Sequence, residues 1–233
     1  MKKIIKISLI LLLVGMAVIA AVPFLKEKRA ERKYENEFKK IQESVTEKKS
    51  DVNGLVKKNK DCIGYVEIPG TTISYPVMQT KDNPDFYLNH DFNRNYSFYG
   101  TPYLSAYCDV EKSDNLIIYG HNINGGKMFG ALEQYKDKEF FYKHRKIYFT
   151  TDKKREYEVF AVMCVNIHKF EYWKFVMAKD EKEYDEFVDK VEEHSSWRQE
   201  NKPKYGEQML MLSTCDNGKG DDWRIVVIGV MQQ

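Results

Sequence analysis

The chain has 233 residues and a formal net charge of +2. This length allows one substantial domain and excludes two large ones. The near-neutral charge provides no global field that would attract nucleic acid, so we expect no nucleic-acid partner. The 16 tyrosines and 13 phenylalanines, many of them in short runs with Val and Ile, favour a β-rich core over a helical bundle.

An apolar run lies near the start of the chain, at residues 4–22, and lysines precede it. Its roughly 19 residues would extend about 28 Å as a helix, which fits a membrane-spanning anchor. A cleaved signal peptide is the alternative, but Pro23 directly after the small residues makes a poor cleavage site. Because the lysines favour a cytoplasmic N-terminus, we expect residues 1–25 to form a cytoplasmic tip and a single transmembrane helix in the cell membrane, with the domain that follows outside the cell.

A charged segment, residues 26–60, follows the apolar run. Four apolar side chains in it repeat at positions i, i+4, i+7 and i+11, which is one face of a helix. We expect a helical stalk whose apolar face packs on the domain that follows, residues 61–233. The four side chains are Tyr34, Phe38, Ile41 and Val45.

The domain reads as a series of short strands with few helices. The clearest helix is predicted at residues 180–197, where Asp180 and Glu183 form a capping box before an apolar stripe. A shorter helix is predicted at residues 127–135. Strands are predicted at 62–68, 72–78, 100–107, 115–119, 146–150, 156–167, 209–214 and 224–231. This pattern predicts a mainly β fold, a roughly eight-stranded β-barrel with peripheral helices, including an N-terminal helix and one inserted before the penultimate strand.

The last two predicted strands bring a thiol and a guanidinium together. The first strand stops at Cys215, a polar loop follows, and the second strand begins at Arg224. If the two strands pair antiparallel, these side chains become neighbours at one rim of the sheet. Only the thiolate form of cysteine attacks, and a fixed positive charge nearby favours that form.

A cysteine nucleophile commonly works with a histidine, and His121 is the best placed of five. It directly follows the strand predicted at 115–119, so it is also expected at a rim. Taken singly, each of the three residues has an ordinary structural explanation: a surface histidine, an inert buried thiol, and an exposed ion pair for Arg224. The other cysteines, Cys62, Cys108 and Cys164, have no metal-binding spacing, so we expect no essential disulfide, no metal and no cofactor.

Taken together, these residues resemble the sortases, the membrane-anchored cysteine transpeptidases of Gram-positive cell surfaces. The resemblance rests on LSTC at 212–215, on Arg224 at the head of RIVVIGVM, and on YGHN at 119–122. It extends over about residues 63–230 and is closest to class B. The segments YPVMQTKDNPDFYLNHDF, GTPYLSAYCDV and NLIIYGHNINGGKMFGALEQY resemble that class. So does the helix predicted at 180–197, since class A members have a short connection there.

The resemblance implies roles for single residues: Cys215 is the nucleophile, His121 the catalytic histidine and Arg224 the catalytic arginine. The enzyme would cleave an NPxTx-type sorting signal of a secreted protein after Thr and form a thioacyl intermediate on Cys215. It would then transfer the protein to a cell-wall amine such as a peptidoglycan precursor. The resemblance also implies substrate-groove positions at Leu88, Tyr119, Tyr172, Ser213 and Thr214.

Three other functions stay open at this point. The chain could be a cell-surface cysteine protease that only hydrolyses, or a sortase that polymerises pilins on a lysine acceptor. A membrane-tethered module that binds peptide without catalysis is the third. The loop at residues 216–223 departs from the family pattern, which leaves the shape of the groove open.

Overall fold

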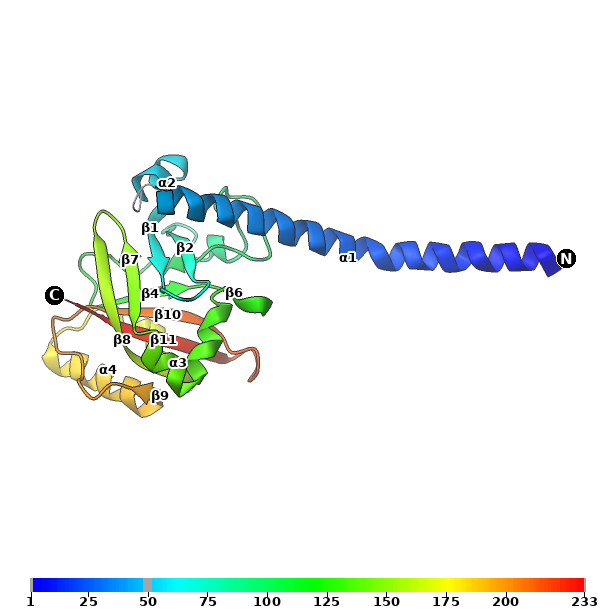
Figure 1. Ribbon diagram of the computed structural model, residues 1–233. Coiled ribbons are helices and arrows are strands. Elements are labelled where there is room, and N and C mark those ends of the chain that lie inside the picture. The colour runs from blue at the N-terminus through cyan, green and yellow to red at the C-terminus, as the bar shows by residue number, and fades with distance from the viewer. Residues whose placement is uncertain (1, 48–51, 233) are drawn as a thin grey trace. The chain divides into compact units, whose positions relative to one another are not determined.

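The computed structural model describes residues 2–47 and 52–232. It divides the chain into two compact units, Met1–Ser44 and Val45–Gln233, and each is described by itself (Figure 1). The functional residues predicted from the sequence all belong to the second unit.

One helix, α1 (Lys2–Glu47), accounts for the first unit and includes the apolar run at residues 4–22. Within residues 2–47 and 52–232, no helix combines the length and the apolar character needed to cross a membrane. The predicted transmembrane anchor is therefore not supported, although the run is helical as expected. The packing of the stalk segment on the domain stays a prediction.

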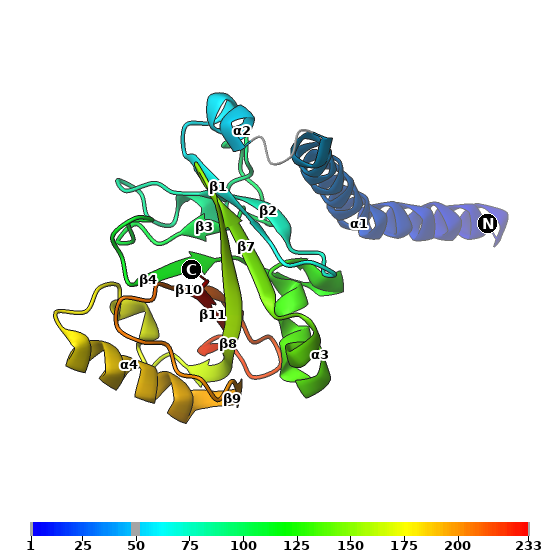
Figure 2. The same ribbon diagram turned by 60° about the vertical axis from the view of Figure 1, so that its left-hand side comes forward.

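Eight strands of the second unit close into a barrel, as the sequence predicted (Figure 2). Their order is β11-β10-β4-β3-β2-β1-β7-β8, and pairing of β8 with β11 completes the ring. A short ninth strand, β9 (Ser195–Arg198), adds to the outer edge of β8. The barrel strands are β1 (Cys62–Glu67), β2 (Ser74–Met78), β3 (Tyr103–Leu104), β4 (Asn115–Tyr119), β7 (Lys146–Thr150), β8 (Lys154–Asn166), β10 (Met209–Cys215) and β11 (Trp223–Met231).

Two predicted strands are shorter than expected. The strand predicted at 100–107 is reduced to β3, since Gly100 takes a positive φ of 60° at a turn. A side chain at Gly100 would lie 2.4 Å from the carbonyl oxygen of Leu88, so the turn holds the chain closely against η1 (Phe86–Leu88). The strand predicted at 72–78 begins only at Ser74.

The helix predicted at 180–197 exists but ends earlier, as α4 (Glu181–His194). Asp180 caps it by accepting a hydrogen bond from the backbone N–H of Glu183 at 2.9 Å, as the capping-box pattern predicted. The three residues after His194 belong to β9, because they pair with β8 instead of continuing the helix. The apolar stripe of α4 is buried, and Figure 2 shows the helix outside the barrel beside β9.

The helix predicted at 127–135 is wrong in its first half. Residues Lys127 and Met128 form β6, which pairs with β5 (Asn122–Ile123) across η2 (Asn124–Gly126). The 3-10 helix η3 (Gly130–Lys136) then follows. The remaining helices are α2 (Val52–Lys58), α3 (Lys138–Lys143) and η4 (Tyr172–Lys174).

Substituting the cap of α4 tests how much this helix contributes to stability. Asp180→Ala removes the side-chain acceptor for the N–H of Glu183, so we expect a loss of about 1 kcal/mol in the free energy of unfolding. Denaturant unfolding measures this free energy, and Lys182→Ala on the exposed face of the same helix is the control. Equal stability of the two variants would show that the cap is not needed.

Buried tyrosines predict an alkaline limit to stability. Burial raises their pKa values above the value of about 10 for a free tyrosine, so the unfolded chain releases these protons first. The stability they contribute is complete below about pH 10 and is lost as the pH rises through the folded pKa values. Burial raises the pKa of Tyr172 to about 12, and it also raises the pKa values of Tyr65, Tyr87, Tyr103, Tyr119, Tyr135, Tyr157 and Tyr184.

The measurement is the thermal midpoint as a function of pH. We expect it to fall steeply above about pH 10. Tyr135→Phe, which removes one buried phenol, should flatten this fall, whereas Tyr96→Phe at an exposed position should not. Parallel curves for both variants would contradict the explanation.

Candidate active site

Strand register brings the three predicted catalytic residues to one rim of the barrel. Cys215 and Arg224 are direct cross-strand partners in the antiparallel pair of β10 with β11. On its other side β10 runs parallel to β4, where Ser213 is level with Tyr119. Cys215 lies two residues beyond Ser213, and His121 lies two residues beyond Tyr119. Both chains therefore reach the rim at the same height.

His121 is held by the main chain of a distant loop. Its Nε2 lies 2.8 Å from the carbonyl oxygen of Leu88. Since a carbonyl only accepts, Nε2 must carry the proton in this contact. The ring of Phe98 lies nearly parallel to the imidazole, with centroids 6.4 Å apart and an interplanar angle of 10°. The histidine thus has a fixed position and a defined proton before any substrate arrives.

Arg224 is held by carbonyl groups of the loop before it. Its Nη1 donates to the carbonyl oxygens of Asp221 at 2.5 Å and of Trp223 at 3.0 Å. The guanidinium is partly exposed and carries a positive charge. Burial raises the pKa values of Tyr119 and Tyr172, and the positive charge of Arg224 lowers them in part. The arginine therefore supplies fixed positive charge beside the thiol of Cys215.

A groove of about 1080 Å³ joins all the predicted site residues. It contains the catalytic triplet and each of the five positions that the resemblance implied for substrate. Its wall at one side is η4, which also contributes Trp173. The predicted residues that line it are Leu88, Tyr119, His121, Tyr172, Ser213, Thr214, Cys215 and Arg224.

Three of the five predicted substrate positions have internal hydrogen bonds. The hydroxyls of Tyr172 and Ser213 lie 2.6 Å apart in a buried pair. Thr214 is only 2% exposed, and its hydroxyl donates to the carbonyl oxygen of Gly120 at 2.7 Å. That bond ties the chain before Cys215 to the chain before His121. Thr214 thus supports the site from within, and only a small part of it faces the groove.

The groove also has lining residues that sequence reasoning did not single out. Tyr107 is 81% exposed at its edge, and Tyr103 donates to a carboxylate oxygen of Asp85 at 3.1 Å. Both residues lie within the strand predicted at 100–107, but nothing in that pattern assigned them to a groove. Asn122, which does not line the groove, was also given no role although it directly follows His121: its amide donates to the carbonyl oxygen of Cys215 at 2.8 Å.

The other three thiols are free but poorly suited to nucleophilic attack. Burial raises the pKa of Cys62 to about 12, and burial also raises the pKa values of Cys108 and Cys164. A thiol with a raised pKa offers little thiolate at neutral pH. Cys215, at a strand end in the groove, is the thiol that the geometry presents to a substrate.

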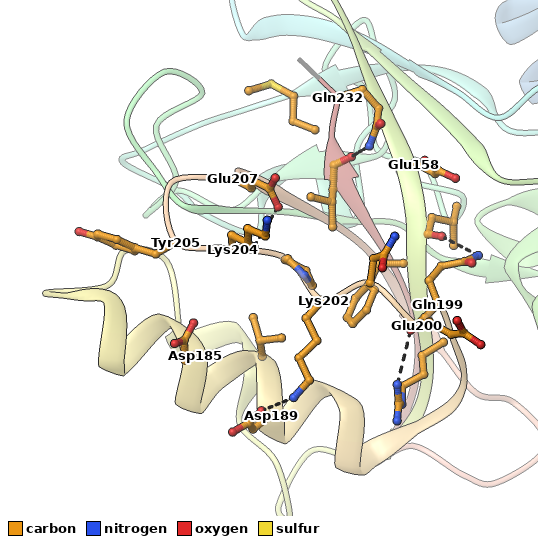
Figure 3. Close-up of a pocket in the computed structure, with 18 of the residues that line it drawn as sticks. Glu158, Asp185, Asp189, Gln199, Glu200, Lys202, Lys204, Tyr205, Glu207 and Gln232 are labelled. Atoms are coloured by element: carbon orange, nitrogen blue, oxygen red, sulfur yellow. Dashed lines mark hydrogen bonds and ion pairs between the residues drawn. The ribbon is translucent and has the colours of Figure 1, made fainter.

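A larger depression lies elsewhere on the domain, between α4, β9 and the chain that follows β9 (Figure 3). Its volume is about 1590 Å³, and charged side chains such as Asp189 and Lys202 line it. None of the predicted catalytic residues reaches it. Size alone therefore does not identify the active site. Across the part of the chain that the structure describes, no group of three His, Cys, Asp or Glu side chains could hold a metal ion.

Comparison with known proteins agrees with this geometry. The family model for the sortase domain matches residues 66–232. Sortase B of Staphylococcus aureus is 26% identical over 231 residues, which cover 97% of this chain and 93% of that protein. Sortase B of Listeria monocytogenes is 31% identical over 186 residues, covering 78% and 74% respectively.

A solved structure gives the same result for the fold. The Staphylococcus aureus sortase B–substrate complex matches with a TM-score of 0.74 and 26% identity, over 89% of this chain and 97% of that one. The region that the family model matches, residues 66–232, includes strands β2 to β11, the groove and the strand ends that carry His121, Cys215 and Arg224. The chain therefore belongs to the sortase family and is, within it, a class B sortase.

Proposed function

We propose that this sortase is a cysteine transpeptidase that cleaves an NPxTx-type sorting signal after Thr and transfers the protein to a cell-wall amine. The observation that carries the proposal is the meeting of Cys215, His121 and Arg224 in one groove. The similar Staphylococcus aureus sortase B was solved as a complex with substrate, which supports a peptide in the corresponding groove here.

In the first half of the reaction, the Cys215 thiolate attacks the backbone carbonyl carbon of the Thr residue in the sorting signal. The bond from sulfur to carbon forms, and the carbonyl oxygen takes negative charge. Arg224 lies beside that position and stabilises the oxyanion through its charge and its N–H groups. As the C–N bond breaks, protonated His121 gives its proton to the leaving amine, and a thioester remains on Cys215.

In the second half, an incoming amine attacks the thioester. Neutral His121 accepts a proton from this amine, the new C–N bond forms, and the C–S bond breaks to return the Cys215 thiolate. Atoms and charges balance over the cycle without any cofactor. The result is transpeptidation whenever an amine reaches the thioester before water does.

The groove offers features for both ends of the signal. Leu88 and the exposed Tyr107 give apolar surface, and the Tyr172–Ser213 pair gives hydroxyl groups. These groups suit a short peptide with alternating polar and apolar side chains. Hydrolysis and pilin polymerisation use the same acylation step, so only the acceptor separates them from the proposed reaction.

We further propose that the catalytic domain acts outside the cell, because sorting signals belong to secreted proteins. Labelling of intact cells with an antibody against residues 61–233 tests the location. Antibody binding that is detected only after the cells are permeabilised would contradict the extracellular location.

A peptide assay tests the proposed chemistry directly. The full chain is incubated with an NPxTx peptide and an amine acceptor, and the products are identified by mass. We expect an amide-linked adduct with the wild type and no cleavage with Cys215→Ala, because that variant has no nucleophile in the groove.

The outcomes distinguish the alternatives. Equal cleavage by Cys215→Ala would reject the cysteine mechanism. Free acid as the only product, whatever the amine, would favour a hydrolytic protease. Efficient transfer only to a lysine-containing pilin peptide would favour the pilin-polymerising function.

Substitution of Arg224 tests the oxyanion role. Arg224→Met removes both the charge and the donors, so we expect kcat to fall by about 10² to 10³-fold. Arg224→Lys keeps the charge but loses the planar fork of donors, so its activity should lie between those of the wild type and Arg224→Met. Arg198→Lys is the matched control. Arg198, on β9, pairs with Glu192 of α4 at 2.8 Å and does not line the groove.

A further inference from the structure

The residues that directly follow the two catalytic residues are joined to each other. Asn122 follows His121, and Asp216 follows Cys215. The Asn122 amide nitrogen donates to the carbonyl oxygen of Cys215 at 2.8 Å. The same nitrogen donates its second hydrogen to Oε1 of Glu133, also at 2.8 Å. Both hydrogens of this amide nitrogen are thus used, and one of them links the residue after His121 to the backbone of Cys215.

The other half of the connection runs through η3. Lys136 Nζ lies 2.6 Å from Oε2 of Glu133, one turn earlier, and 2.7 Å from Oδ1 of Asp216. The contacts therefore close a ring: the Cys215 carbonyl, Asn122, Glu133, Lys136 and Asp216, with the peptide bond from Asp216 back to Cys215. We call these four side chains the η3 ring.

Charge makes the ring hard to open. The Asp216 side chain is fully buried, and its Oδ1 also accepts from the backbone N–H of Gly218 at 3.1 Å. A buried carboxylate needs a cation or several donors, and Lys136 is the cation that reaches it. Within the described residues its second oxygen, Oδ2, has no hydrogen-bond partner. The buried charge of Asp216 consequently depends on Lys136.

Lys136 is suited to that task. Partial burial lowers its pKa, but the hydrogen bonds to Asp216 and Glu133 and the negative charges of both carboxylates together raise it by more, so the net shift is upward. The ammonium group therefore stays charged across the range in which the enzyme would work. It binds Asp216 and Glu133 at the same time, whereas Asn122 is neutral and contributes directed hydrogen bonds.

We infer that the η3 ring is a positioning device that fixes the separation of His121 from Cys215, and that Lys136 is its central residue. The inference rests on the proposed function, because it concerns the proton transfer between these two groups. None of the four ring side chains lines the groove, so they act through the residues beside them. A displacement of about 1 Å at the reacting atoms is enough to reduce a rate by up to 10²-fold.

Steady-state kinetics of the full chain test the ring. With the NPxTx peptide and amine acceptor, Lys136→Met and Asn122→Ala should each lower kcat by about 10 to 10²-fold. KM should stay within about twofold, because the substrate groove is untouched. Lys136→Arg keeps a cation that reaches both carboxylates and should retain most of the wild-type kcat.

Folding must be separated from positioning. Lys136→Met leaves the buried Asp216 carboxylate without its cation and can lose stability for that reason alone. The double variant Lys136→Met/Asp216→Asn removes both charges while leaving the ring open. We expect it to unfold near the wild-type temperature and still to show the lowered kcat.

Lys202→Met is the matched control. Lys202 also bridges two carboxylates, at 2.7 Å to Asp189 and 2.5 Å to Glu192, but beside the depression away from the groove (Figure 3). Its loss should leave kcat and KM unchanged. A similar fall in kcat for Lys202→Met would mean that any broken lysine bridge impairs the enzyme, and the positioning role would be rejected.

The remaining outcomes are equally decisive. Wild-type kcat in the folded double variant, or a change in KM alone, would overturn the inference. Cys215→Ala is measured beside these variants. If it cleaves the peptide, the proposed function fails; if it is inactive while Asn122→Ala and the double variant are fully active, only the ring fails.

Discussion

The site depends on one constraint: β10 pairs with two neighbours of opposite direction at once. Its parallel pairing with β4 sets the height of Cys215 relative to His121, and its antiparallel pairing with β11 sets Cys215 against Arg224. A slip of one residue against either neighbour would turn the thiol to the other face of the sheet. Closure of the barrel through β8 and β11 prevents such a slip, because each strand is held on both sides.

This arrangement explains why the site can be both charged and rigid. Below the rim, the strands that carry the site bury apolar side chains such as Leu212 and Ile225. The polar groups are confined to the strand ends, where main-chain carbonyls hold His121 and Arg224 and the Tyr172–Ser213 pair satisfies itself. In the proposed reaction such fixed dipoles would need little reorganisation, and this is how a preorganised site lowers the barrier electrostatically.

Much of this could be predicted from the sequence, and the limits have a physical cause. The barrel strands have apolar runs with clear ends, and the α4 cap has a local pattern, so both were found. The predictions for the end of α4 and for the start of η3 were wrong, because strand pairing with β8 and with β5 overrides the helical pattern there. His121, Cys215 and Arg224 each stand at a strand end, which made their meeting predictable. The contacts that orient them link residues far apart in the chain, as between Asn122 and Cys215, and no local pattern encodes those.

The contact between His121 and Leu88 also bears on which nitrogen exchanges the proton. Nε2 faces a carbonyl oxygen, so it stays protonated for as long as that contact lasts. In the neutral imidazole the free lone pair is then on Nδ1, so in the proposed reaction Nδ1 would be the atom that accepts and returns the proton. Leu88 is at the end of η1, held by the turn at Gly100. The tautomer of His121 is therefore set by the segment around Leu88, and in the proposed reaction a change in that segment would act on proton transfer without touching Cys215.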